Sequence, residues 1–170
     1  MSDMNVITDA ENNTLIFERV FAAPHERVWA AWTQAEQLAQ WWGPRGWVTT
    51  VKEFDFRPGG HLLYGMTCED PAQGNFYGRT EWAKSAYKTI DEPRSFSYTD
   101  YFTDENGTVN DTMPTMDITM EFAAVETGTK VRSTSVFASR EAYEQTLAMG
   151  VAEGVGQTWD RLSELLAQDN

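Results

Sequence analysis

Residues 22–32 read AAPHERVWAAW, and residues 40–44 read QWWGP. Val28, Trp29 and Trp32 lie at helical spacing, and the apolar residues of 38–42 do so again. Pro24 suits the first turn of a helix, where its missing N–H costs nothing, and the Gly-Pro pair at 43–44 is typical of a helix end. The two stretches therefore predict two short helices.

The rest of the chain is dominated by patterns of period two, which indicate strands. We expect strands at 14–21, 47–56, 61–68, 95–103, 115–124 and 129–137, and one or two within 75–90 with an irregularity around 83–86. Ser139 is a suitable N-cap for a long last helix, whose apolar stripe runs from Leu147 to Leu166 and is interrupted by Gly150, Gly154 and Gly156. At Gly154 we expect the helix to approach the sheet closely.

The order of these elements predicts an α+β fold of the helix-grip type. We expect a curved antiparallel sheet of about six or seven strands wrapped around the long C-terminal helix, with the two short helices after the first strand. Residues 1–13 are predicted to be a flexible N-terminal segment, and residues 14–168 a single domain. A curved sheet closed by a helix encloses a pocket.

Composition limits the classes of partner. The formal net charge of −13 repels nucleic-acid phosphates and anionic lipid surfaces, and no Lys/Arg cluster offsets it. The sequence therefore predicts neither a nucleic-acid nor a membrane partner. A single cysteine, Cys68, excludes an internal disulfide and favours the reducing cytoplasm.

Five motifs are similar to one known family: residues 23–29 (APHERVW), 41–44 (WWGP), 55–60 (DFRPGG), 90–93 (IDEP) and 159–162 (WDRL). Together they resemble the START-like (Bet v 1-like, SRPBCC) superfamily, and within it the group of Hsp90 ATPase activator homologues. The resemblance covers nearly the whole chain and implies a helix-grip fold with a hydrophobic cavity, but no universal catalytic residues. The group usually has Gly-Trp where this chain has Gly154-Val155, which implies a reshaped cavity.

Large apolar and aromatic side chains are the candidates for the cavity wall, because flat rings and flexible Met side chains accommodate apolar ligands. The predicted ligand-binding residues are Trp41, Trp42, Tyr64, Trp82, Tyr98, Met116, Met120, Phe137, Val151 and Val155. Core packing is the alternative role for each of them.

Candidates for catalysis are few. His61 follows a Gly-Gly turn and is a possible general acid or base, with an exposed strand-edge position as the alternative. Glu81 is a second candidate if it is buried. The two histidines and one cysteine have no spacing typical of a metal site, so we predict neither a metal nor a cofactor.

These observations favour binding of a small hydrophobic ligand in an internal cavity, as a carrier or sensor. Two alternatives remain open: a cavity enzyme of the cyclase, hydrolase or lyase kind, and a chaperone or stress-response cofactor that binds a protein partner. A homodimer through an exposed strand edge is also compatible with the sequence. The identity of the ligand is not encoded in any motif.

Overall fold

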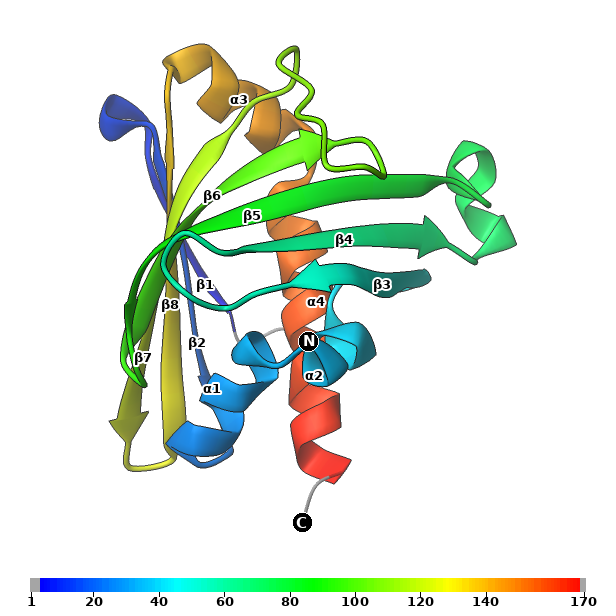
Figure 1. The fold of residues 1–170 in the computed structure, drawn as a ribbon. Helices are drawn as coiled ribbons and strands as arrows, with labels where there is room; N and C mark the ends of the chain where they lie inside the picture. Colours follow the sequence, from blue (N-terminus) through cyan, green and yellow to red (C-terminus); the bar gives the residue numbers. More distant parts are fainter. Residues whose placement is uncertain (1–3, 169–170) are drawn as a thin grey trace.

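The computed structural model describes residues 4–168 and is built on one antiparallel sheet of eight strands (Figure 1). The strand order is β1-β2-β8-β7-β6-β5-β4-β3. The strands are β1 (Asn5–Asp9), β2 (Thr14–Phe21), β3 (Trp47–Phe54), β4 (His61–Cys68), β5 (Thr80–Asp91), β6 (Ser95–Thr103), β7 (Met116–Val125) and β8 (Gly128–Phe137). The helices are η1 (Ala10–Asn12), α1 (His25–Thr33), α2 (Ala35–Trp41), η2 (Pro71–Phe76), α3 (Arg140–Ala148) and α4 (Val151–Gln168).

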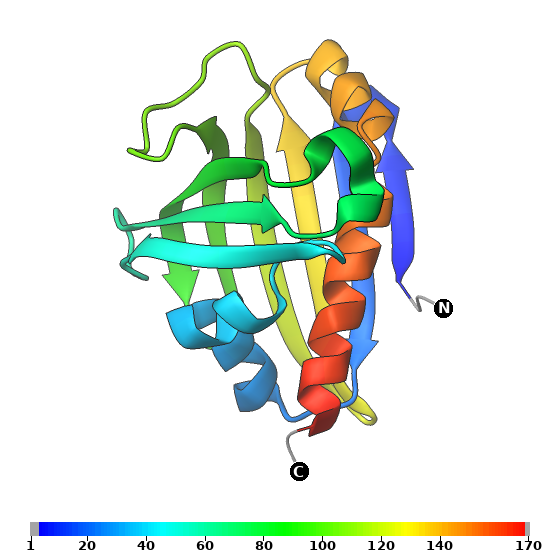
Figure 2. The same cartoon turned by 90° about the vertical axis from the view of Figure 1, so that its right-hand side faces the viewer.

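The sheet curls around α4, which crosses its concave face, while α1 and α2 close one end (Figures 1 and 2). Along each strand, side chains point alternately toward the concave face and away from it, so burial alternates with a period of two residues. Along β7, Ile118, Met120 and Phe122 are buried, while Thr119 and Glu121 between them are exposed. The α+β helix-grip architecture predicted from the sequence is confirmed.

The aromatic residues of the opening motif form a dense core at the end of the sheet near α1. Trp29 and Trp32 each pack edge-on against Phe122, with ring centroids 5.0 and 5.3 Å apart. Trp32 also packs against Trp159 of α4 at 5.9 Å. Edge-to-face contacts of this kind stabilise beyond the burial of area alone, by about 0.5–1.5 kcal/mol each. The motif therefore fixes α4 against the sheet.

The N-terminal segment is more ordered than the sequence predicted. Asn5–Asp9 pair with β2 and add an edge strand, and Asp9 caps the short helix η1. The side chains of β1 are mostly exposed, so the segment lacks the alternation of apolar and polar residues by which a half-buried strand is predicted from sequence. Residues 1–3 of the predicted flexible segment lie outside the described residues.

Three further boundaries differ from the predictions. The first hairpin strand ends at Phe54 rather than at residue 56, and the irregularity in β5 lies between Tyr87 and Thr89 rather than at 83–86. The last helix is two helices, because Gly150 takes a left-handed φ of +80° that breaks the chain between α3 and α4. Within residues 4–168, no helix combines the length and apolarity needed to cross a membrane.

Candidate functional site

A cavity of about 350 Å³ lies between the concave face of the sheet and α4. Its wall is mostly apolar and comes from β2, β4–β8, Trp32 of α1, the Trp42–Pro44 turn, the end of α3 and the first half of α4. Met149, which is 55% exposed, and the half-exposed Glu81 both line it, so the cavity reaches solvent at these residues. Its size is within the range of small-molecule sites.

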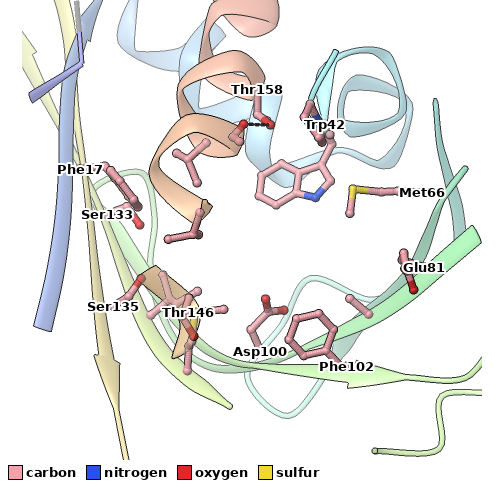
Figure 3. A pocket seen from close by; sticks show the side chains of 18 of the residues that line it. Phe17, Trp42, Met66, Glu81, Asp100, Phe102, Ser133, Ser135, Thr146 and Thr158 are labelled. Carbon is pink, nitrogen blue, oxygen red and sulfur yellow. Dashed lines mark hydrogen bonds between the residues drawn. The ribbon is translucent and has the colours of Figure 1, made fainter. Parts of the chain in front are cut away.

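Trp42 forms part of the wall because the turn that carries it is tied to α4. The guanidinium Nη1 of Arg161 lies 2.8 Å from the carbonyl oxygen of Gly43 and 3.1 Å from that of Trp47, and 3.4 Å from the carbonyls of Trp42 and Pro44. Thr49 Oγ1 also donates to the Trp42 carbonyl at 2.6 Å. These contacts hold the indole at the cavity (Figure 3).

Asp100 is a carboxylate inside this apolar wall. It lies on β6 opposite Ser85 of β5 and Met116 of β7, and its side chain points into the cavity (Figure 3). Burial raises the pKa of Asp100 from 3.8 to about 7, although the hydrogen bond from Ser85 Oγ, at 3.1 Å, opposes the shift. The group therefore changes charge near neutral pH.

Two buried tyrosines, Tyr64 and Tyr98, lie in the wall near Asp100. Burial, and next the negative charge of Asp100, raise the pKa of both phenols well above their ordinary value. Both hydroxyls therefore stay protonated at physiological pH.

A second polar region lies to the left of Asp100 in Figure 3. It consists of Ser133 and Ser135 of β8 and Thr146 of α3. Thr146 is 5% exposed, and its hydroxyl oxygen is buried with no hydrogen-bond partner among the described residues. A buried hydroxyl of this kind costs free energy unless a ligand or water satisfies it.

Gly154 contributes space rather than the close helix–sheet approach predicted from the sequence. It lines the cavity, and a Cβ built on it would meet no heavy atom within 4 Å. Gly154 and its neighbour Val155 therefore form an open part of the α4 wall.

Most of the predicted ligand-binding residues line the cavity. Those that do are Trp42, Tyr64, Trp82, Tyr98, Met116, Met120, Val151 and Val155. Trp41 and Phe137 do not, because both are core residues: the Trp41 indole donates to the Ala31 carbonyl at 3.0 Å, and Phe137 packs on Tyr143.

Trp82 has a different role from the other aromatic lining residues. An ideal Cβ at Gly65 would lie 3.0 Å from Trp82 ring atoms, so the ring occupies the space that glycine leaves free. Lys52 Nζ lies 5.7 Å from the centroid of the same ring. Trp82 is thus one of the lining residues, but its ring packs over Gly65 of β4.

The two predicted acid–base candidates occupy different places. His61 does not line the cavity; its Nε2 lies 2.6 Å from Glu53 Oε1 in a half-exposed pair. Glu81 lines the part of the cavity that opens to solvent, and its Oε1 lies 3.4 Å from Arg79 Nη2. Residues 4–168 contain no group of three or more His, Cys, Asp or Glu side chains placed to hold a metal ion.

Sequence reasoning missed Asp100, Ser133, Ser135 and Thr146. Period two could have found the first three, because Asp100 shares a strand face with Tyr98, and both serines share one with Phe137. No such pattern identified Thr146, because its position at the cavity depends on the break at Gly150 between α3 and α4.

Known structures share this fold over nearly their whole length. Protein Ms6760 from Mycobacterium smegmatis is 34% identical, with a TM-score of 0.84 and 95% of each chain covered. A protein from Staphylococcus epidermidis is 32% identical (TM-score 0.82), covering 98% of this chain and 96% of that one. One from Arthrobacter aurescens is 29% identical (TM-score 0.87), with 96% and 91% covered.

A sequence search of curated proteins gave no significant match. The family described as "Activator of Hsp90 ATPase homolog 1-like protein" matches residues 22–167, which include the opening motif, strands β3–β8 and all but the last residue of α4. The chain therefore belongs to the family of Activator of Hsp90 ATPase homolog 1-like proteins.

Proposed function

We propose that this protein binds a small hydrophobic molecule in the cavity between the sheet and α4, as a carrier or sensor. The observation that carries the proposal is the cavity itself: about 350 Å³, mostly apolar, with polar groups in a few places. Natural ligand sites combine these properties, the apolar surface giving affinity and the few polar groups giving orientation. The small apolar partner and the cytoplasmic location inferred from the single cysteine belong to the same proposal.

Gly154 offers a direct test, because a larger side chain there enters the cavity without meeting another group first. The neutral dye prodan, whose emission shifts to the blue in apolar surroundings, serves as the probe. We expect wild-type protein to bind prodan and to melt at a higher temperature with it, because a ligand that prefers the native state stabilises that state. G154L should abolish both effects.

G154A is the matched control, since it adds one methyl group and should keep prodan binding. Undiminished binding in folded G154L would place the dye elsewhere and contradict the proposal. Absence of prodan binding by the wild type would also count against it.

A second candidate function, a cavity enzyme, is favoured by Asp100. A carboxyl group with a pKa of about 7 that faces a substrate-sized cavity is suited to general acid–base catalysis. D100N separates the two functions: an enzyme variant keeps ligand binding and loses product formation, whereas a carrier returns the ligand unchanged in both proteins. Binding of a protein partner and homodimer formation remain predictions from the sequence.

A further inference from the structure

The charged side chains that line the cavity, among residues 4–168, have one sign. Asp100 and Glu81 are the ionisable acids of its wall, and no Lys, Arg or His is among the described residues that line it. Three cations lie nearby. The Arg161 guanidinium lies against the main-chain carbonyl oxygens of Trp42, Gly43 and Pro44. Arg79 faces Glu81, and Lys52 lies over the ring of Trp82. The net charge of −13 adds to the same field. The cavity therefore favours a cation over an anion.

Within residues 4–168, Asp100 has no charged partner; its hydrogen-bond partner is Ser85. Ser85 occupies one carboxylate oxygen, Oδ1, and the described residues provide no second hydrogen bond to this group. Figure 3 shows the carboxyl pointing into the open space of the cavity, next to Phe102. A carboxylate in an apolar wall is costly unless it is paired, and the space in front of it can hold the pairing group only if that group belongs to a ligand.

Aromatic rings surround this space. Trp42 lies across the cavity from Asp100 (Figure 3), and its ring packs edge-on against Tyr64 at 6.0 Å. Tyr98 and Phe102 lie two residues before and two residues after Asp100, on the same face of β6. Aromatic faces attract ammonium groups, most strongly where water is excluded. An ammonium group at Asp100 would thus meet a carboxylate and several rings together.

We propose that the ligand of this cavity is a hydrophobic amine, bound as its cation, with the ammonium group against Asp100 and the apolar body along the wall formed by Met116, Ile118 and α4. This inference rests on the proposed function and specifies the chemical class of its ligand. Glu81, where the cavity reaches solvent, attracts the same charge during entry.

Three compounds that share a naphthyl ring and differ in the charge of its substituent test the preference for a cation: naphthylmethylamine (positive), naphthylmethanol (neutral) and naphthoate (negative). Isothermal titration calorimetry near pH 8, where Asp100 is ionised, gives the three affinities. We expect the amine to bind at least about tenfold more tightly than the alcohol, as close charge pairs at interfaces do, and naphthoate to bind most weakly. D100N should remove the advantage of the amine and keep binding of the alcohol.

D117N is the matched control, because Asp117 is paired with Thr99 and Lys88 on the exposed side of the neighbouring strand. It should keep the preference for the amine. Equal affinities of amine and alcohol in the wild type would overturn the inference and leave the proposed function standing. A preference that survives D100N, or is abolished by E81Q instead, would overturn the assignment to Asp100. Failure of all three compounds to bind overturns the inference, and the prodan titration then decides the proposed function separately.

Discussion

Replacing Asp100 by Asn should make the protein more stable, and the gain should grow with pH. The folded state holds the Asp100 proton more tightly than the unfolded state does, because burial raises the pKa from 3.8 to about 7. The stability linked to this proton is complete below pH 3.8 and is lost as the pH rises through about 7. Asn remains neutral throughout and can still accept the hydrogen bond from Ser85.

The size of the effect follows from the two pKa values. Each tenfold change in proton affinity is worth about 1.4 kcal/mol. Relative to strongly acidic solution, the raised pKa of Asp100 therefore lowers the free energy of unfolding of the wild type by about 4 kcal/mol near pH 8 and by about 1.6 kcal/mol near pH 5. The advantage of D100N in free energy of unfolding should therefore increase by about 2.5 kcal/mol from pH 5 to pH 8. Urea denaturation of both proteins at each pH measures it, and contributions shared by both proteins cancel in the difference.

D117N gives the matched comparison. Hydrogen bonding to Thr99, and next to Lys88, lowers the pKa of Asp117, so its stabilisation is present above pH 3.8 and is lost only in more acidic solution. D117N should be less stable than the wild type by the same amount near pH 5 and pH 8. If the difference in free energy of unfolding between D100N and the wild type were also the same at pH 5 and pH 8, the argument that ionisation of Asp100 inside the cavity destabilises the protein would be refuted.

The remaining predictions concern the cavity wall and its anchor. T146V should raise the free energy of unfolding by about 1 kcal/mol, because it removes a buried hydroxyl that has no hydrogen-bond partner among the described residues. T158V should bring no gain, because the Thr158 hydroxyl donates to the Gly154 carbonyl oxygen at 2.8 Å. Thermal melts of both variants measure the difference, and a larger gain in T158V than in T146V would contradict the argument. R161M should cost about 2–3 kcal/mol in urea denaturation and weaken prodan binding, since Trp42 loses its anchor. R45M removes only an exposed pair with Glu164 and should cost less than about 1 kcal/mol; equal losses in the two variants would argue against the anchor.

The fold was accessible from the sequence because its signals are local and repeated. The Trp-rich helices and the alternation of β7 each reflect a face buried against one core, so period and motif were sufficient. The exceptions have physical reasons. The strand at Asn5–Asp9 buries almost nothing, and its existence depends on pairing with β2. The helix break depends on one backbone angle at Gly150, and glycine inside an apolar stripe is also compatible with an unbroken helix.

The site was predictable in composition but only partly in detail. The choice of large aromatic side chains identified Trp42, Tyr64 and Tyr98 as lining residues, since the wall of an apolar cavity is built from the same residue types as a core. The same rules could not separate cavity from core, so Trp41 and Phe137 were included. The chemistry of Asp100 depends on what surrounds it across three strands, and no single segment of sequence contains that information.

The two ends of the concave face differ in how they are filled. Near α1, Trp29 and Phe122 belong to a packed aromatic core that Trp32 borders from the cavity side, while near the α3–α4 break the same sheet is hollow. Substitutions at the hollow end change a surface that touches few neighbours, whereas those at the filled end disturb a close-packed core. A substitution near the α3–α4 break of this chain can thus change the shape of the cavity and leave the aromatic core near α1 intact.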